Sequence, residues 1–464
     1  MTIVAFLLAF ALGALFVRCA LPEFETRPRW AGWLLELSLA AGFGMGLTGS
    51  LYFVLLWAGL ARYELWFELV ALAILAVIVY RLRLRRPAVE APAGPTFSWN
   101  WLLLLMLGVC GLLYALSFYE AAANNPQGEW DAWAIWNLRA KFLAGGEATW
   151  RNAISPLLGK THPEYPLLLS GFIARCWGIA GETTSTAPLA AAWIFPAAAC
   201  GVLLGGLAIL RSVSMGLVAA LILLTTGSYT GQSMAQYADV PLSFYLVAAL
   251  VLLGCAERFP ERADFLVAAG AAAGMAAWTK NEGAAFFVLA LVGCGLFLGW
   301  RTPQWLVAGA APFLILFAVF KAGLAPRVDT VIARDGGSFV SKLVEPGRYW
   351  QVFSAMVVDI WETGFPASHP LLVFLILVIF LRFRTRVELR SIRVVALPAL
   401  GMMVAYFVAL LTTRDDLRWQ LDTTSSRLLM QIWPGLILAG LLTLKSIEEH
   451  ATIAGPARKK ARSK

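Results

Sequence analysis

The sequence is poor in charged residues and in histidine, and each shortage excludes some classes of protein. Charged residues make up 14% of the 464 residues, whereas soluble domains average about 25%. The chain has three histidines and six cysteines, with no C-x-x-C and no H-x-x-x-H spacing. These absences argue against a soluble protein and against the usual thiol or zinc motifs. We expect the cysteines to be small buried apolar residues.

Long apolar runs take the place of the missing charge. Hydrophobic residues make up 60% of the chain, in runs of roughly 17–25 residues, the length of a helix that crosses a bilayer. A membrane β-barrel would show alternating segments of about ten residues instead. The sequence therefore predicts an all-α polytopic membrane protein with about 13 transmembrane helices. The predicted spans are roughly 2–20, 31–60, 64–81, 99–119, 188–210, 213–228, 239–256, 264–279, 283–300, 303–321, 369–383, 394–412 and 427–445.

Many basic residues lie at the ends of these runs, so the net charge of +9 does not indicate a nucleic-acid partner. An odd number of spans places the basic loops on one face, including those with Arg211, Arg258 and Arg384. The positive-inside rule makes this face cytoplasmic, so we expect an external N-terminus and a cytoplasmic C-terminus. The first apolar run lacks a basic segment before it and a cleavage motif after it, which predicts a retained helix.

Three regions follow from this topology. Residues 1–98 are an N-terminal extension of three spans with a basic cytoplasmic linker, residues 99–445 are the transmembrane core, and residues 446–464 are a basic cytoplasmic tail. The long loops of the core, at 120–187, 322–368 and 413–426, lie on the external face. Loops of this length in a membrane protein are usually functional, so we expect the chemistry there.

The first external loop contains the longest polar stretch of the chain. It carries Glu129 and Asp131, and Asp131 opens a segment in which Ile135, Leu138 and Phe142 lie on one helical stripe. This spacing predicts a short amphipathic helix at the membrane interface over residues 131–142. Three residues turn away from the apolar stripe: Trp133, Asn137 and Lys141.

The motif HPEYP follows at residues 162–166. Its two prolines favour an extended chain, and the apolar pattern of residues 167–177 predicts a second helix lying along the membrane. His162, Glu164 and Tyr165 therefore lie at the start of that helix, on the same face as Asp131 and Arg139. The ordinary alternative for a single histidine is that it only bonds the loop backbone.

Polar residues also stand at the external ends of other spans. Asp239 precedes an apolar run in the sequence ADVPL. The motif KNEG, with Lys280, Asn281 and Glu282, interrupts a long apolar segment. Arg427 opens the last span in SSRLLMQIWP. Lys280 and Arg427 are suited to holding a phosphate, with Glu282 or Asn281 as a hydrogen-bond partner.

Each of these residues also has an ordinary structural interpretation. Asp131 and Asp239 suit the first turn of a helix without any further role. The KNEG segment suits a tight turn, and Arg427 suits an interfacial anchor. The functional interpretation depends on their agreement, because a separate charge argument places all of them on the external face.

These motifs together resemble the GT-C superfamily of polytopic membrane glycosyltransferases. The resemblance covers roughly residues 99–440 and rests on the acids of GEWDAW, on HPEYP, and on the acid of ADVPL, with KNEG and SSRLLMQIWP beside them. The chain is most similar to proteins like the protein O-mannosyltransferases, the aminoarabinose–lipid A transferases and the rhizobial lipopolysaccharide glycosyltransferases. Three predicted spans precede the part that matches, and Glu164-Tyr165 departs from the proline-rich motif of the family.

The resemblance implies transfer of a sugar from a polyprenyl-phosphate donor to an acceptor, with inversion at the sugar carbon. The acceptor would be a glycolipid, a glycan or a protein on the external, periplasmic face of the cell inner membrane. Asp131 would be the general base, with Glu129 as its substitute. Lys280, Arg427 and Arg139 would hold the phosphate. Asp239 and His162 would orient the acceptor or a divalent ion, which the sequence does not require.

Three other functions stay open at this stage. A transporter or flippase of a lipid-linked saccharide would carry its charged residues in the middle of spans. An O-antigen ligase or polymerase would use a diphosphate donor, and an assembly subunit would have no chemistry. The transferase hypothesis makes a geometric prediction: Asp131 and Asp239 lie together above a lipid-accessible hollow, with a cation close by.

Overall fold

The protein is helical in nearly all of the residues that the structure describes. This computed structural model describes residues 1–21, 24–25, 29–83, 89–90, 100–326, 338–364 and 369–449. Within these ranges the strands are β1 (Phe24–Glu25) and β2 (Val89–Glu90), which pair in parallel. Parts of the basic linker (84–88 and 91–99), of the loop 322–368 (327–337 and 365–368) and of the tail (450–464) lie outside the described residues. The predicted all-α fold is confirmed.

Nine helices in the described part of the chain are long and apolar enough to cross a membrane. A tenth span is formed if α8 (Val213–Leu224) and α9 (Gly227–Met234), which meet at an angle of 63°, count as one. Three of these spans include adjoining short helices: η1 precedes α3, η6 follows α13, and α18 with η9 precedes α19. The nine are α1 (Thr2–Ala20), α2 (Arg29–Trp57), α3 (Glu64–Arg83), α4 (Asn100–Asn124), α7 (Thr186–Leu210), α10 (Asp239–Arg258), α13 (Pro303–Val319), α17 (Arg393–Leu411) and α19 (Ser426–Leu442).

The prediction of about 13 spans is therefore only partly supported. The other predicted spans are helices too, but α11 (Asp264–Thr279) and α12 (Glu282–Phe297) have 16 residues, and α8 and α16 (Pro370–Leu381) have 12. Sixteen helical residues rise about 24 Å, which is less than the roughly 30 Å of a hydrocarbon core. Nearly all of α11 is buried in protein, so its apolar character reflects the core as much as a membrane.

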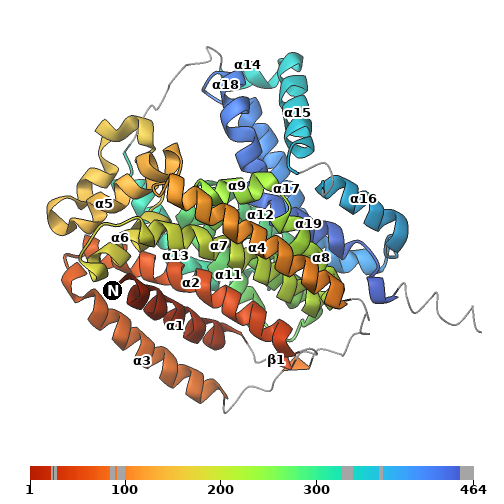
Figure 1. The fold of residues 1–464 in the computed structure, drawn as a ribbon, viewed down its shortest axis with the longest axis horizontal. Helices are drawn as coiled ribbons and strands as arrows, with labels where there is room; N and C mark the ends of the chain where they lie inside the picture. The colour runs from red at the N-terminus through yellow and green to blue at the C-terminus, as the bar shows by residue number, and fades with distance from the viewer. Residues whose placement is uncertain are drawn as a thin grey trace, which may run out of the picture.

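The connecting segments contain shorter helices. After α4 come the π-helix η2 (Ala132–Asn137), α5 (Leu138–Ala144) and the buried helix α6 (Leu168–Ala180). Figure 1 shows α5 and α6 at one end of the helical body. The remaining short elements are η1 (Ala61–Tyr63), η3 (Gly146–Ala148), η4 (Trp150–Ile154), η5 (Pro156–Thr161), η6 (Phe320–Leu324), α14 (Phe339–Leu343), α15 (Pro346–Trp361), η8 (Glu388–Ile392), α18 (Leu417–Gln420) and η9 (Leu421–Ser425).

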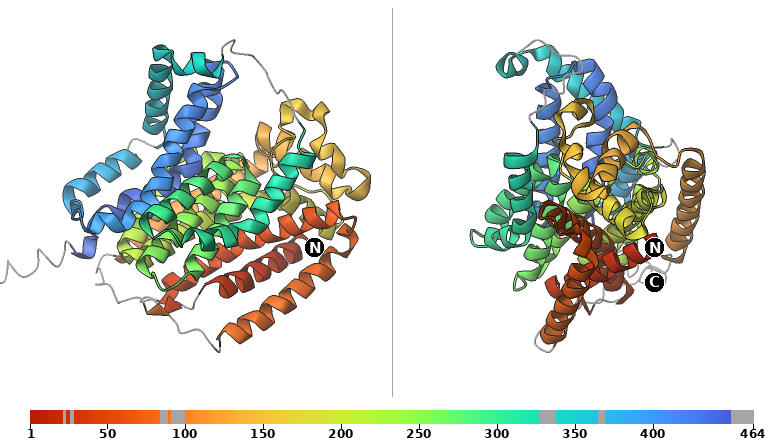
Figure 2. Two further views of the ribbon diagram at one scale, coloured as in Figure 1. Left: turned by 180° about the vertical axis from the view of Figure 1, so that it is seen from behind. Right: turned by 90° about the vertical axis from the view of Figure 1, so that its left-hand side faces the viewer.

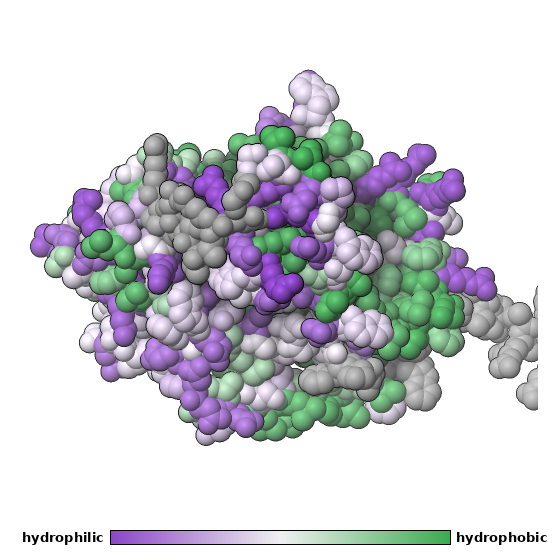
Figure 3. All heavy atoms as spheres, turned by 90° about the horizontal axis from the view of Figure 1, so that it is seen from above, coloured by the Kyte–Doolittle hydropathy of each residue, from purple (hydrophilic) through white to green (hydrophobic). Residues whose placement is uncertain are grey.

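Helix α10 is the centre of the fold. It is buried from Asp239 to Ala256 and packs against α7, α11, α17 and α19. The N-terminal helices α1 to α3 and the C-terminal helices α15 to α19 lie on opposite sides of this centre (Figures 1 and 2). Seen from above, hydrophilic side chains gather across the middle of one face, next to hydrophobic areas (Figure 3). The polar start of α10 is thus fixed by helices on every side.

The helix predicted for residues 131–142 is observed as η2 and α5, but one side chain points in another direction than predicted. Asn137 is buried, although the α-helical spacing turns it away from the apolar stripe, whereas Trp133 and Lys141 are exposed as predicted. The reason is that residues 132–137 form a π-helix, which has more residues per turn than an α-helix. The wider turn rotates Asn137 into the protein, where its side chain donates to the Gln127 carbonyl oxygen at 3.5 Å.

The helix predicted over residues 167–177 is observed as α6, and it is enclosed by protein. All of its residues from Leu168 to Trp177 are buried, and it packs against α2, α5 and α7. The fully buried Arg175 on α6 donates to both carboxylate oxygens of Glu68 on α3, at 2.5 and 2.6 Å, and lies 3.2 Å from Glu64. This ion cluster joins α3 to α6, which is why a helix with an arginine can lie inside the protein.

Two helix pairs approach each other through glycine. A Cβ atom on Gly309 of α13 would lie 1.9 Å from the Val267 carbonyl oxygen, and one on Gly270 of α11 would lie 2.0 Å from the Leu306 carbonyl oxygen. A Cβ on Gly44 of α2 would lie 2.0 Å from the Ala9 carbonyl oxygen. Small residues at such contacts let membrane helices pack closely.

We expect Gly309→Ala to lower the free energy of unfolding by about 1–3 kcal/mol, because the new methyl group overlaps the α11 backbone. Thermal unfolding of the purified protein in detergent measures this loss. Gly108→Ala on α4 is the matched control, since nothing lies within 4 Å of a Cβ there. Equal melting temperatures for the two variants would contradict the close approach of α11 and α13.

Candidate functional site

Five helix ends meet at the candidate site. Asp239 is the first residue of α10, Arg427 the second residue of α19, and Lys280 lies between α11 and α12. Glu282 begins α12, and Asp131 directly precedes η2. Residues that are far apart in the sequence are therefore brought together by the positions of the helices around α10.

Asp239 is the most enclosed acid of this group, with a side chain that is 1% exposed. Its Oδ1 accepts hydrogen bonds from Lys280 Nζ at 2.8 Å and from Gln431 Nε2 at 2.5 Å. Its Oδ2 accepts from Arg427 Nη2 at 2.9 Å. The carboxylate is thus satisfied by three side chains from two other segments, α19 and the turn between α11 and α12, so it does more than open α10.

Arg427 connects this acid to the first external loop. Its Nη2 donates to the Asp131 carboxylate as well as to Asp239. Its guanidinium lies over the Tyr237 ring, 4.5 Å from the ring centre. The predicted meeting of Asp131 and Asp239 next to a cation is therefore present in the structure. Asp131 makes no cap hydrogen bond to η2, so its side chain is directed to Arg427 instead.

A second layer of polar side chains supports the ion pairs and consists of Glu282, Gln431 and Tyr406. Glu282 Oε1 lies 3.4 Å from Lys280 Nζ and 3.5 Å from Gln431 Nε2. The Tyr406 hydroxyl donates to Gln431 Oε1 at 2.7 Å, which orients the amide toward Asp239. Burial lowers the pKa of Lys280, but Asp239 and Glu282 raise it by more, so the net shift is upward and the ammonium stays charged.

The HPEYP motif reaches the site through Tyr165. Its ring lies 5.9 Å from Lys280 Nζ and stacks on both His162, at 4.6 Å, and Trp136, at 5.9 Å between ring centres. His162 Nδ1 lies 3.1 Å from Glu164 Oε1. Lys321 Nζ donates to the Glu164 carbonyl oxygen at 2.5 Å. His162 and Glu164 therefore pair with each other and support the aromatic wall, without a hydrogen bond to Asp131 or Asp239.

Two residues predicted for the site lie apart from the ion pairs. Arg139 is fully buried and donates to the carbonyl oxygens of Ala153, Pro163 and Tyr165. These bonds hold the loop, while the Arg139 Nη1 group is buried without a hydrogen-bond partner. Glu129 is exposed, and its side chain accepts from Asn125 at 3.3 Å. Burial lowers the pKa of Arg139 by more than the charge of Glu164 raises it, so the net shift is downward.

Several side chains of the site were not predicted. Gln431 lies four residues after Arg427, which places both on one face of α19, so helical spacing could have indicated it. Tyr237 stands two residues before Asp239, but its position over Arg427 depends on the loop conformation. Tyr406 comes from α17 and Lys321 from η6, and only the fold brings them here.

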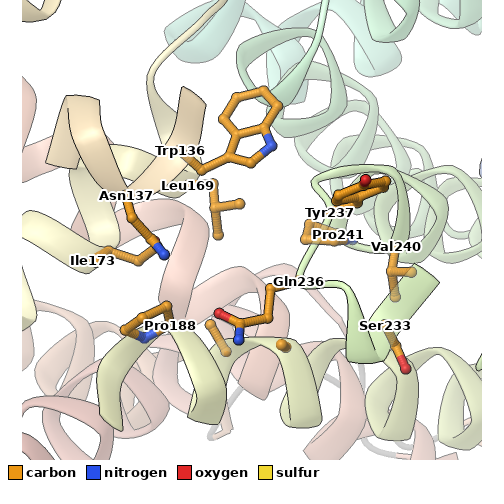
Figure 4. A pocket seen from close by; sticks show the side chains of 12 residues that line it. Trp136, Asn137, Leu169, Ile173, Pro188, Ser233, Gln236, Tyr237, Val240 and Pro241 are labelled. Atoms are coloured by element: carbon orange, nitrogen blue, oxygen red, sulfur yellow. The ribbon is translucent and has the colours of Figure 1, made fainter. Parts of the chain in front are cut away.

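A small cavity lies beside Tyr237, the residue whose ring Arg427 covers. Trp136, Asn137, Gln236 and Tyr237 line it, with apolar residues of α6 and α7 behind them (Figure 4). Its volume is about 10 Å³, close to what a single water molecule needs. Trp136 Nε1 and Gln236 Oε1 are buried there without a hydrogen-bond partner. The cavity has a few polar groups in a mostly apolar wall, and it is much smaller than the predicted hollow.

Among the described residues, no group of three or more His, Cys, Asp and Glu side chains is arranged to hold a metal ion. Asn281 Oδ1 and Glu282 Oε2 are buried without a hydrogen-bond partner. These oxygens can accept from a ligand that carries hydroxyl groups. The site therefore offers fixed cations, partly satisfied acids and free acceptors.

Comparisons with models of protein families, with curated proteins and with solved structures give no match for this chain. The similarity to GT-C glycosyltransferases accordingly stays a prediction that rests on the sequence motifs. The roles of the site residues are argued below from their geometry alone.

We expect Asp239→Asn and Lys280→Met to lower the free energy of unfolding by about 3–5 kcal/mol each, because each breaks the buried ion pair between the two residues. The double variant should lose less than the sum of the two, since the interaction between the two residues is lost only once. Thermal unfolding in detergent measures all three. Glu129→Gln, at an exposed acid, should stay within about 0.5 kcal/mol of wild type. Strictly additive losses would mean that Asp239 and Lys280 do not interact.

Proposed function

We propose that the protein is an integral membrane glycosyltransferase that uses a polyprenyl-phosphate sugar and acts on the external face of the inner membrane. The observation that supports this best is the bridge of Arg427 between Asp131 and Asp239. Such a transfer needs a carboxylate that takes a proton from the acceptor hydroxyl. It also needs cations for the leaving phosphate. The bridge brings both kinds of group to one place.

The two acids differ in how firmly they are held. Asp239 accepts bonds from Lys280, Gln431 and Arg427, and its carboxylate is almost fully buried. The Asp131 side chain is 12% exposed, and its described hydrogen bond is the one from Arg427. Asp131 is therefore the acid that can leave its partner and act as a base, whereas Asp239 keeps Arg427 and Lys280 in position.

The net charge of the cluster determines which group a bound phosphate competes with. Three carboxylates (Asp131, Asp239 and Glu282) and two cations (Lys280 and Arg427) give a net charge of −1. A phosphate adds negative charge and therefore competes with Asp131 for Arg427. Binding of the donor then releases the Asp131 carboxylate, so the base becomes free only when the sugar is present.

The transfer step follows from this exchange. The acceptor hydroxyl gives its proton to Asp131 while its oxygen forms a bond to the anomeric carbon of the sugar. The bond from that carbon to the phosphate oxygen breaks, and its electron pair stays on the phosphate. Arg427 and Lys280 stabilise the charge that develops there. Attack from the side opposite the phosphate inverts the anomeric carbon.

The cavity in Figure 4 is suited to part of a sugar. Trp136 and Tyr237 offer aromatic faces, and the free Trp136 Nε1 and Gln236 Oε1 match a hydroxyl acceptor and donor. At about 10 Å³ it must widen to admit a ring. A larger apolar cavity of about 320 Å³ lies between α1, α2 and the same part of α7. Its apolar lining suits a lipid chain.

The decisive variant is Asp131→Asn, which we expect to lower transfer by at least about 100-fold, because the amide cannot accept the proton. Cells that lack the gene should accumulate the lipid-linked sugar donor, and mass spectrometry of extracted lipids measures it. A plasmid with the wild-type gene should remove the accumulated donor, and one with Asp131→Asn should not. Melting temperatures of the purified variants show whether each is folded.

Glu129→Gln is the matched control, because it changes a nearby exposed acid and should restore wild-type lipids. Restoration by a folded Asp131→Asn would remove Asp131 from the mechanism, and failure of Glu129→Gln alone would assign the base to Glu129. Accumulation of a diphosphate-linked sugar would favour a ligase or polymerase. No change in lipid-linked sugars on loss of the gene would contradict the transferase proposal.

A further inference from the structure

A second polar cavity lies at the opposite ends of the spans, away from Asp131 and Asp239. It is formed where α7, α10 and α19 end and α17 begins, and its volume is about 190 Å³. Arg211, Arg258 and Arg384 line it together with Glu257, and the rest of its wall is apolar. Three guanidinium groups against one carboxylate leave this wall with a charge of +2. The arginines belong to the face that the positive-inside rule makes cytoplasmic.

The arginines donate hydrogen bonds to the protein, but two of their N–H groups have no acceptor. The Arg211 side chain is 8% exposed, and its Nη2 donates to the Leu444 carbonyl oxygen at 2.7 Å and to Glu449 at 3.2 Å. Arg258 Nη1 donates to the Leu210 carbonyl oxygen at 2.8 Å. Arg211 Nε and Arg384 Nε are both buried without a hydrogen-bond partner. Unpaired buried N–H groups are costly, so they mark a place where an acceptor belongs.

The segment that carries Arg384 is fixed to the end of α19. The Arg384 backbone N–H donates to the Thr443 carbonyl oxygen at 2.9 Å, and the Lys445 N–H donates to the Arg382 carbonyl oxygen at 3.1 Å. These backbone hydrogen bonds fix the position of Arg384 in the cavity that Arg211 also lines. Burial lowers the pKa of Arg211, and the like charge of Arg384 lowers it further. An anion between the two groups would relieve this repulsion.

Two acids at the rim do not fill the cavity. Glu449 pairs with Arg211 and Glu388 lies 3.9 Å from Arg384, and both carboxylate side chains are 44% exposed. Neither lines the cavity. Because neither carboxylate enters the cavity, both leave room for an anion inside it.

We propose that this cavity binds the phosphate group of an anionic phospholipid in the cytoplasmic leaflet. Phosphate oxygens accept the paired N–H groups of arginine, and basic pockets between membrane helices on this side suit lipid headgroups. The position at the helix ends corresponds to the headgroup level. Ile379, Phe380 and Phe383, which precede Arg384, are more than half exposed and give the acyl chains an apolar surface.

The test uses the purified full chain in nanodiscs of equal parts phosphatidylglycerol and phosphatidylcholine, or of phosphatidylcholine alone. Phosphatidylglycerol should raise the melting temperature of the wild type, and native mass spectrometry should detect it bound to the protein. Arg384→Gln should weaken this binding about tenfold, because it removes a charged donor from the phosphate. Arg382→Gln is the matched control, since this exposed arginine on the same segment does not line the cavity.

The two sources of phosphate are separated by a third arm with inorganic phosphate in phosphatidylcholine nanodiscs. It should neither raise the melting temperature as phosphatidylglycerol does nor displace that lipid. An equal effect of inorganic phosphate would assign the cavity to a soluble anion and overturn the lipid proposal. Equal binding by wild type and Arg384→Gln, or an equal effect of phosphatidylcholine, would also overturn it. None of these outcomes depends on the transferase reaction, because no sugar is present.

Discussion

The buried carboxylate of Asp239 is the interaction on which the rest of the structure depends. A charge at the start of the most enclosed helix can exist only if other groups pay for its removal from water. Lys280 does so from the turn between α11 and α12, and Gln431 and Arg427 do so from α19. This requirement fixes the ends of α11, α12 and α19 around α10, and it brings Arg427 within reach of Asp131. The same bonds that hold the helices together therefore shape the candidate site.

The two polar regions use arginine in different ways. At the start of α19, Arg427 is shared by two acids and lies over an aromatic ring. At the other end of the spans, Arg211 and Arg384 each keep a buried N–H group without an acceptor. In the first arrangement the protein itself supplies the partners of the arginine. The second is already open to an anion, because the protein supplies fewer acceptors than donors.

Much of this architecture could be predicted from the residues, and the failures have physical causes. Apolar runs indicated the helices, and the costly position of charges at span ends indicated Asp131, Asp239, Lys280 and Arg427. Local spacing could not indicate the π-helix that turns Asn137 inward, nor the burial of α6. Arg139 was predicted to hold phosphate because its type suits that role, and this stays a prediction. The loop carbonyl groups that it bonds are a property of the folded chain, which local spacing could not indicate.

The ion cluster of Arg175 has a consequence for how the chain is made. Glu68 and Arg175 are 107 residues apart, so α3 leaves the ribosome well before its partner exists. Until α6 follows, two carboxyl groups of α3 stand in or near lipid without a cation, a state that the membrane disfavours. Helix α3 can therefore take its final place only after α6 has been synthesised. The outermost helix of the N-terminal region is in this sense among the last to be secured, although it is one of the first to be translated.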